Sequence, residues 1–276
     1  MERADKMNKN FKSAVSYIWI YLVLAFLYLP ILILAFYSFT SSTMIGSVRG
    51  FTFDNYVTLF TEPELISMMV GTIVLALGVA ILSTFLGTIG AIGSFYSKKG
   101  IKFSIELANE VPIVNADVVT GFSVCIFMIV LLRLDKSTFV PLVFAQTALC
   151  APFVYLSVMP RLKQMDQSLY EAAMDLGCNP AMALVKAIIP QIIPGILSGF
   201  FTAITLSLDD YFIATYTKPA TFDTISTYVV NATRGSQTSI KTALWALSAI
   251  IFVIVVIAVV IMNITGETEE GGRHNA

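Results

Sequence analysis

Six long apolar segments run through the sequence and constrain its fold more than any other feature. Each has about 20 residues or more, enough for a helix to cross a hydrocarbon layer of roughly 30 Å. Hydrophobic residues make up 57% of the 276 residues and charged residues only 13%, more apolar surface than one small core can bury. The sequence therefore predicts an all-α polytopic membrane protein with about six transmembrane helices. The segments are Ser16–Phe39, Met68–Ser94, Pro112–Leu132, Phe139–Met159, Gly195–Thr215 and Thr242–Ile264.

The distribution of basic residues predicts the orientation of the chain. With the N-terminus in the cytoplasm, 11 of the 17 lysine and arginine residues lie on the cytoplasmic side, as the positive-inside rule requires. An even number of spans places both termini on that side. The first apolar segment is too long for the core of a signal peptide, and no small-x-small cleavage site follows it. The predicted plan is a cytoplasmic tail over 1–15, a transmembrane domain over 16–264 and a cytoplasmic tail over 265–276.

Composition and motifs argue against several classes of function. A net charge of −1 gives no basic field for nucleic acid, and the three cysteines are isolated from one another. The single histidine, His274, lies in a polar tail, so neither a metal site nor histidine catalysis is predicted. The sequence contains no GxxxxGK[ST] phosphate loop, so any ATP chemistry has to come from another chain. HExxH and GxSxG are absent as well, which disfavours a membrane enzyme.

Two of the predicted helices carry small residues at helical spacing. Such stripes let helix backbones approach closely in lipid. For the second segment we expect packing within one subunit. For the fifth, packing within the subunit and an interface between subunits both remain open. The residues are Ala76, Ala80, Ser83, Gly87, Gly90 and Ser94 in the second segment, and Gly195, Gly199, Ala203 and Ser207 in the fifth.

The polar segment 161–194, on the predicted cytoplasmic side, has helix signals of its own. Ser168 and Glu171 fit a capping box, and Gly177 is placed to end this helix in a left-handed conformation. A second helix is predicted to start after Asn179, with a proline at its first position. The chain is then expected to be interrupted before the fifth span by Pro190 and Pro194.

The first of these short helices has a narrow apolar face at i, i+3, i+4 and i+7 spacing. Such a face is too small to form a core alone. It either lies on the protein's own helix ends or enters the groove of a partner. The residues of the face are Leu169, Ala172, Ala173 and Leu176.

The same segment contains the pattern Glu171-Ala172-Ala173-x3-Gly177-x9-Ala187-x-Ile189-Pro190. This pattern resembles the EAA loop of permease subunits from binding-protein-dependent ABC importers, which have the MetI-like fold. Ala187 and Ile189 stand where isoleucine and leucine are usual, and both changes remain apolar. The resemblance implies that this helix is a coupling helix, which docks into a cleft of a separate ATPase subunit. The coupling residues that it implies are Glu171, Ala172, Ala173, Asp175, Leu176 and Gly177.

Three aspartates interrupt the predicted spans: Asp117 in the third, and Asp209 and Asp210 in the outer half of the fifth. A carboxylate there costs a few kcal/mol, so it should face protein or water. Adjacent residues on a helix point about 100° apart, so one of the pair can face a pathway while the other pairs with a neighbouring helix. Since no lysine or arginine lies deep in a span, these aspartates are either protonated or matched by positive charge from a partner subunit or the transported solute. An acidic passage for a cationic solute is favoured. The alternative is a structural carboxylate that caps a helix break or bonds to nearby hydroxyls such as those of Thr205 and Ser207.

The run Thr205–Tyr211, the EAA loop and the six-helix length together resemble the C-type permease subunit of spermidine/putrescine ABC importers. The resemblance implies an inner-membrane subunit whose polyamine route is lined by Asp117, Asp209, Asp210 and Tyr211. It implies as partners an ATPase dimer, a second and different permease, and an extracytoplasmic polyamine-binding protein. ATP and Mg²⁺ would be bound by the ATPase, and no cofactor by this chain. Alternatives are an importer permease for another small solute, or an ion-coupled secondary transporter whose aspartates carry protons.

Overall fold

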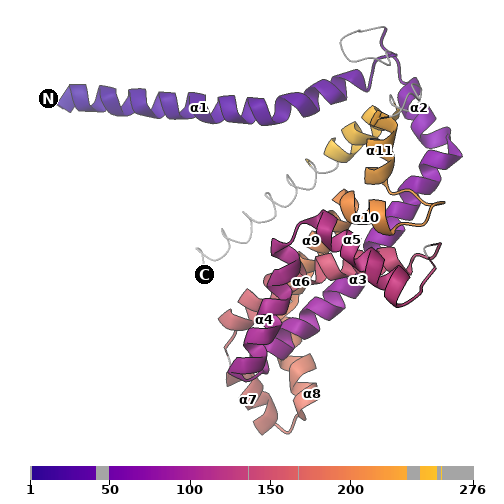
Figure 1. The fold of residues 1–276 in the computed structure, drawn as a ribbon. Coiled ribbons are helices and arrows are strands. Elements are labelled where there is room, and N and C mark those ends of the chain that lie inside the picture. The colour runs from indigo at the N-terminus through magenta and orange to yellow at the C-terminus, as the bar shows by residue number, and fades with distance from the viewer. Residues whose placement is uncertain are drawn as a thin grey trace. The chain divides into compact units, whose positions relative to one another are not determined.

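The computed structural model describes residues 2–41, 50–135, 137–166, 168–234, 243–253 and 256. Within these residues every regular element is a helix, and one isolated antiparallel bridge joins Thr40 to Phe51 (Figure 1). The chain divides into two compact units. The first comprises 1–66 with 232–276, and the second comprises 67–231.

In the first unit, helix α1 (Glu2–Tyr37) is followed by the short helix α2 (Asp54–Thr61). The buried side chain of Asn55 fixes the turn after α1, because its Nδ2 donates to the carbonyl oxygens of Ser38 and Thr40 at 2.7 and 2.9 Å. A short apolar helix over Ala243–Val253 belongs to the same unit, and its Trp245 ring packs edge-on against Tyr37.

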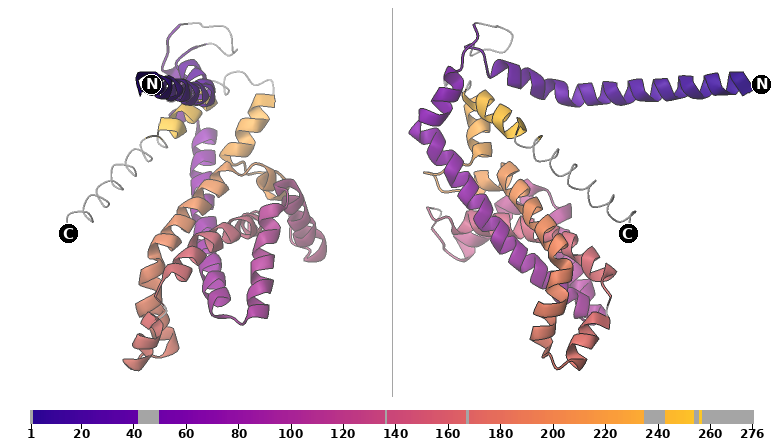
Figure 2. Two further views of the ribbon diagram at one scale, coloured as in Figure 1. Left: turned by 90° about the vertical axis from the view of Figure 1, so that its left-hand side faces the viewer. Right: turned by 180° about the vertical axis from the view of Figure 1, so that it is seen from behind.

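Helices α3 to α10 and most of α11 form the second unit (Figures 1 and 2). It also contains two π-helical turns, η1 directly after α5 and η2 between α8 and α9. Their bounds are α3 Pro63–Tyr96, α4 Lys99–Val114, α5 Asp117–Ile126, η1 Phe127–Leu131, α6 Val140–Gln164, α7 Ser168–Asp175, α8 Pro180–Ala183, η2 Leu184–Ile188, α9 Ile189–Asp209, α10 Phe212–Thr217 and α11 Ile225–Arg234. The first residues of α3 and the last of α11 belong to the first unit.

Four stretches among the described residues are long and apolar enough to cross a membrane: Tyr17–Tyr37, Pro63–Tyr96, Val140–Gln164 and Pro180–Asp209. They confirm the first, second and fourth predicted spans and most of the fifth. A bent pair, α4 with α5 and η1, brings the number to five if it is counted as one span. Of the sixth predicted span, Thr242–Ile264, only 243–253 and 256 are described, and the rest lies outside the described residues, as does the tail 265–276.

The prediction of one continuous third span over Pro112–Leu132 is wrong. Helix α4 ends at Val114, Asn115 and Ala116 are extended, and α5 leaves the break at an angle of 109° to α4. Pro112 is compatible with a helix end at this point, because it removes one backbone donor and crowds the preceding turn. The Asn115 side chain stabilises the break by donating to Thr120 Oγ1 at 3.0 Å. The apolar composition of this segment gave no sign of the bend between α4 and α5.

The prolines before the fifth span do not interrupt the chain, contrary to expectation. Pro190 lies in the first turn of α9 and Pro194 lies inside it, and the helix runs on from α8 through η2. The π-helical turn shifts the hydrogen-bond pattern just before Pro190, a local adjustment by which spanning helices accommodate proline.

The small-residue stripe of α9 packs against α6 of the same chain, which settles the question left open by the sequence. A Cβ atom on Gly199 would lie 2.9 Å from Val154 Cγ1, and one on Gly195 would lie 2.9 Å from the Ser157 carbonyl oxygen. Further along the two antiparallel helices, the Cys150 thiol approaches the Ala203 carbonyl oxygen at 3.7 Å. The α9 stripe is therefore an interface within the subunit.

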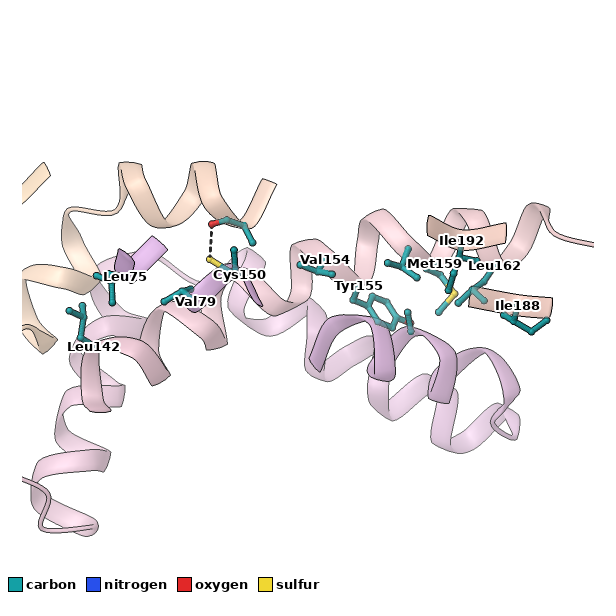
Figure 3. Close-up of a cluster of buried hydrophobic side chains, with 14 of the residues drawn as sticks. Leu75, Val79, Leu142, Cys150, Val154, Tyr155, Met159, Leu162, Ile188 and Ile192 are labelled. Atoms are coloured by element: carbon teal, nitrogen blue, oxygen red, sulfur yellow. Dashed lines mark hydrogen bonds between the residues drawn. The ribbon is translucent and has the colours of Figure 1, made fainter. Parts of the chain in front are cut away.

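The stripe of α3 also packs within the subunit, as expected. A Cβ on Gly87 would lie 2.6 Å from the Ala151 carbonyl oxygen of α6, and Tyr155 of α6 donates to Ser94 Oγ of α3 at 3.0 Å. The resulting core is shared by α3, α6, η2 and α9 (Figure 3). It includes Leu75, Val79, Leu142, Val154, Met159, Leu162, Ile188 and Ile192.

Candidate functional site

The segment between α6 and α9 folds into two short helices joined by a glycine turn. Gly177 has a positive φ of 88°. Its N–H donates to the Met174 carbonyl oxygen at 2.9 Å, and the N–H of Cys178 donates to that of Ala173 at 3.1 Å. This pair of backbone hydrogen bonds is a Schellman motif, which confirms Gly177 as the left-handed end of α7. The start of α8 is confirmed as well, since Asn179 Oδ1 accepts from the Met182 N–H at 2.7 Å.

The start of α7 differs from the predicted capping box. Ser168 is already helical, and the carboxylate of Asp166, two residues earlier, accepts its backbone N–H at 2.9 Å. Asp166 therefore takes the capping role that the sequence suggested for Ser168. The hydrogen bonds from Ser168, chiefly from its backbone N–H, lower the pKa of Asp166 below its usual range. The Asp-x-Ser spacing could have indicated this cap, because aspartate is as good a capping residue as serine.

The predicted coupling residues of α7 and its turn lie on the surface of the second unit. Ala173 is half-buried, and Leu176 has 87% of its surface exposed. Tyr170, on the same helix, packs against Tyr96 at the end of α3, with ring centroids 5.4 Å apart. Helix α7 is therefore held to the unit at Tyr170, while Leu169, Ala172 and Leu176 of its apolar face stay exposed. The exposed coupling residues are Glu171, Ala172, Asp175, Leu176 and Gly177.

The contact between Tyr96 and Tyr170 puts the α3–α4 turn and the α7–α8 pair at one end of the second unit. Figure 2 shows both at the lower end of this unit. The basic residues of these connections, at 98, 99 and 102 on one side and at 161 and 163 on the other, thus belong to one end. The sequence-based prediction puts this end on the cytoplasmic side, which stays a prediction.

A second group of predicted residues lies where α9 ends. The predicted span Gly195–Thr215 is not one helix: α9 stops at Asp209, Asp210 is extended with ψ 112°, and α10 starts at Phe212. The sequence Asp209-Asp210-Tyr211 gave a reason to look for such a break, since aspartate favours caps over helix interiors.

Asp210 is buried at this break, with 8% of its surface exposed, and it caps α10. Its Oδ1 accepts the Ile213 N–H at 2.9 Å, and its Oδ2 accepts the Ala214 N–H at 3.0 Å. The Oδ2 atom also accepts from Gln146 Nε2 of α6 at 2.9 Å. The carboxylate therefore has the partners that a structural cap needs, including one on a neighbouring helix.

The other residues predicted to line the solute path are more exposed to solvent than Asp210. Asp209 is exposed, Tyr211 is half-buried, and Asp117 is exposed as the first residue of α5. Asp117 and Asp210 each lie at the start of a short helix, α5 and α10 respectively. Whether these four residues contact a solute stays a prediction.

Helices α5 and α10 bring the two breaks together. A Cβ on Gly121 of α5 would lie 2.9 Å from the Cα atom of Ile213 of α10, so the backbones touch. One turn on, Cys125 Sγ approaches the Tyr216 carbonyl oxygen at 3.2 Å. The two helices thus run parallel, and Asp117 and Asp210 lie at the same end of the pair. Side chains of the described residues form no group of three or more metal-binding side chains here or elsewhere in that part of the chain.

Sequence reasoning missed Gln146, which lies in the predicted fourth span. It is fully buried and joins Asp210 to Ser207, whose hydroxyl donates to Gln146 Oε1 at 2.9 Å. A glutamine inside an apolar segment was the available signal, because a buried amide in lipid needs partners on other helices.

Comparison with known proteins agrees with this architecture. Residues 84–266 match the family described as "Binding-protein-dependent transport system inner membrane component". The putrescine transport system permease protein PotI of Escherichia coli is 31% identical over 219 residues, covering 76% of each chain. The spermidine/putrescine transport system permease protein PotC of Haemophilus influenzae is 27% identical over 246 residues, covering 89% of this chain and 93% of that protein.

Solved structures share the fold at lower sequence identity. A chain of a bacterial ABC transporter involved in the import of the acidic polysaccharide alginate matches with a TM-score of 0.67 and 20% identity, over 90% of this chain and 93% of that one. The bacterial alginate transporter in complex with alginate pentasaccharide-bound periplasmic protein matches with a TM-score of 0.68 and 19% identity, over 88% and 90% of the two chains.

Proposed function

The chain belongs to the family of inner membrane components of binding-protein-dependent transport systems, and from this premise we propose that it is a permease subunit of an ATP-driven polyamine importer. The observation that carries the solute assignment is the placement of Asp117, Asp209 and Asp210 at two adjoining helix breaks. Transporters commonly build their solute sites from discontinuous helices, where backbone and polar groups can line a cavity. Carboxylates at such a site favour a solute that carries ammonium groups.

The relatives support this solute class. PotI is named for putrescine, and PotC for spermidine and putrescine. We assign contact with the ammonium groups chiefly to the exposed carboxylates of Asp117 and Asp209, with Tyr211 beside them. Asp210 contributes negative charge from its capped position at the break.

Coupling to ATP is assigned to a separate ATPase dimer. Helix α7 offers it an apolar face that the subunit itself leaves uncovered, including the exposed Leu176. The Schellman turn at Gly177 makes this face a compact knob, and Glu171 adds a polar contact. ATP and Mg²⁺ belong to the partner, because the sequence has no phosphate loop.

The full importer would contain further partners and a fixed orientation. A second, different permease completes the pathway, and an extracytoplasmic polyamine-binding protein delivers the solute. We assign the α7 end, with its basic residues, to the cytoplasmic side and expect both termini on that side as well. ATP-driven closure of the ATPase dimer moves the coupling helices and opens the acidic site outward, and hydrolysis returns it inward.

Uptake competition tests the proposal. Vesicles that contain the whole complex, with its binding protein and internal ATP, are supplied with labelled putrescine. Unlabelled spermidine and putrescine should compete, whereas neutral amino acids should not. Absence of saturable putrescine uptake would indicate an importer for another solute, and uptake by this chain without an ATPase would indicate an ion-coupled transporter.

A further inference from the structure

Gln146 is a fully buried amide in α6, and both of its polar atoms bond to the segment around the α9–α10 break. Its Nε2 donates to Asp210 Oδ2, and its Oε1 accepts from the Ser207 hydroxyl, each at 2.9 Å. A flipped amide would turn an acceptor oxygen toward the carboxylate, so these bonds fix its orientation. The side chain thus binds Asp210 from a neighbouring helix in one fixed orientation.

The partners of Asp210 show what this amide adds. Two backbone N–H groups of α10 bind the carboxylate from one side, and Gln146 is the side-chain donor from α6. Asp117 begins α5, the helix that packs on α10, so it supplies no donor to this carboxylate. A buried carboxylate deprived of one donor has either to take up a proton or to move toward water.

We propose that Gln146 is a positioning residue for solute transport, which holds Asp210 as a carboxylate on the first turn of α10 and so fixes the α9–α10 break beside Asp117. The inference rests on the proposed function of this acidic site. Gln146 does not touch the solute. It acts through Asp210, and Ser207 acts through Gln146 by anchoring the amide oxygen.

The geometry also explains why the interface between α6 and α9 ends at this point. The small residues Gly199 and Ala203 bring the two backbones close in the preceding turns. At the next turn the contact is polar, through Ser207 and Gln146. Close packing thereby sets the distance over which the amide reaches Asp210.

Replacing Gln146 by glutamate separates a positioning role from a merely structural one, because only the positioning role predicts that uptake recovers at low pH. At about pH 7.5 the Gln146→Glu side chain and Asp210 are two facing acceptors, and we expect uptake to fall about tenfold relative to wild type. At about pH 5.5 a proton shared by the two carboxyl groups restores a donor toward Asp210, so relative uptake should recover at least in part. Gln146→Leu, which cannot donate at any pH, should stay low at both values.

The control is Gln164→Glu, the same change at an exposed position at the end of α6. Its uptake relative to wild type should not change with pH. Rates are compared at equal amounts of assembled complex and divided by the wild-type rate at the same pH, which removes the pH dependence of the ATPase and the binding protein. Among the described residues, the ionisable groups to consider near Asp210 are Asp209, Asp117 of α5 and the Cys150 thiol of α6, and all three are unchanged in every variant.

Wild-type uptake by Gln146→Leu, or equally low uptake by Gln146→Glu at both pH values, would overturn the inference. If the glutamate variant does not assemble, Ser207→Ala decides the matter: a two- to threefold loss of uptake with normal assembly supports the role of Gln146, and unchanged uptake refutes it. If the wild-type complex transports a solute other than a polyamine, the proposed function fails, while the same ratios measured with that solute still test Gln146.

Discussion

Asp209 and Asp210 are neighbours in the sequence, but their side chains have opposite surroundings. Asp209 is exposed at the last position of α9, whereas Asp210 is buried and accepts three hydrogen bonds from α10 and α6. The peptide between them marks the end of one helix and the cap of the next. Two chemically identical side chains are thereby suited to two different tasks.

This difference predicts different effects of the same substitution. Asp209→Asn removes a charge from an exposed site, so we expect putrescine uptake to fall severalfold while assembly and thermal stability stay within about 0.5 kcal/mol of wild type. Asp210→Asn removes a charged acceptor from the cap of α10, so it should lower uptake too. In addition, it should lower the free energy of unfolding by about 1–3 kcal/mol. Thermal unfolding of the purified complex and vesicle uptake measure the two quantities. Equal effects of the two substitutions on both measurements would contradict the assignment.

The α3–α6 interface predicts that one glycine of α3 is required and another is not. A Cβ on Gly87 would lie 2.6 Å from the Ala151 carbonyl oxygen and 2.7 Å from Val154 Cβ, whereas one on Gly93 would have no neighbour within 4 Å. Gly87→Ala should therefore destabilise the subunit by about 1–3 kcal/mol through overpacking, and Gly93→Ala by less than about 0.5 kcal/mol. Thermal unfolding in detergent compares the two. The packing would be in doubt if both variants unfolded at the wild-type temperature.

The exposed apolar residue of the α7 turn predicts a site of coupling. Leu176→Asp places a charge where we expect a groove of the ATPase, and should weaken ATPase binding by about tenfold or more without changing the fold of this subunit. Met182→Asp is the matched control, since Met182 is also exposed but lies on α8, outside the segment Glu171–Gly177. Co-purification of the ATPase and ATP hydrolysis stimulated by the binding protein report the effect. A loss of the same size in both variants would argue against a specific role for Leu176.

The cap of α7 predicts a pH range over which the coupling helix is stable. Because hydrogen bonds from Ser168 lower the pKa of Asp166, the stabilisation is fully present above the ordinary carboxyl pKa of about 3.9 and is lost only as pH falls through the lowered value. Amide hydrogen exchange in α7, corrected for intrinsic rates, should show constant protection between about pH 5 and pH 8. Asp166→Ala should reduce this protection, and Asp166→Asn should retain part of it, because asparagine also caps helices. Protection that fell between pH 8 and pH 5 in the wild type would contradict this cap.

Local features of the sequence were sufficient for several parts of the structure. The apolar segments predicted most of the spanning helices, and Gly177 and Asn179 predicted the end of α7 and the start of α8. Each of these signals acts over at most a few turns of one helix: the length of an apolar run, a residue that tolerates positive φ, a side chain that accepts a nearby N–H. The pattern from Glu171 to Pro190 also predicted the family, because its spacing is contained within one stretch of the chain.

By itself, then, the sequence determined that the chain lies in a membrane, where its helices start and end at strong caps, and which family it joins. Only the tertiary structure decided that the chain turns at Asn115–Ala116, that the α9 stripe faces α6 of the same subunit, and that Asp210 rather than Asp209 is buried. The physical reason is distance along the chain. Gln146 and Asp210 are 64 residues apart, and their hydrogen bond exists because α6 and α9 pack closely enough to bring an amide to a carboxylate.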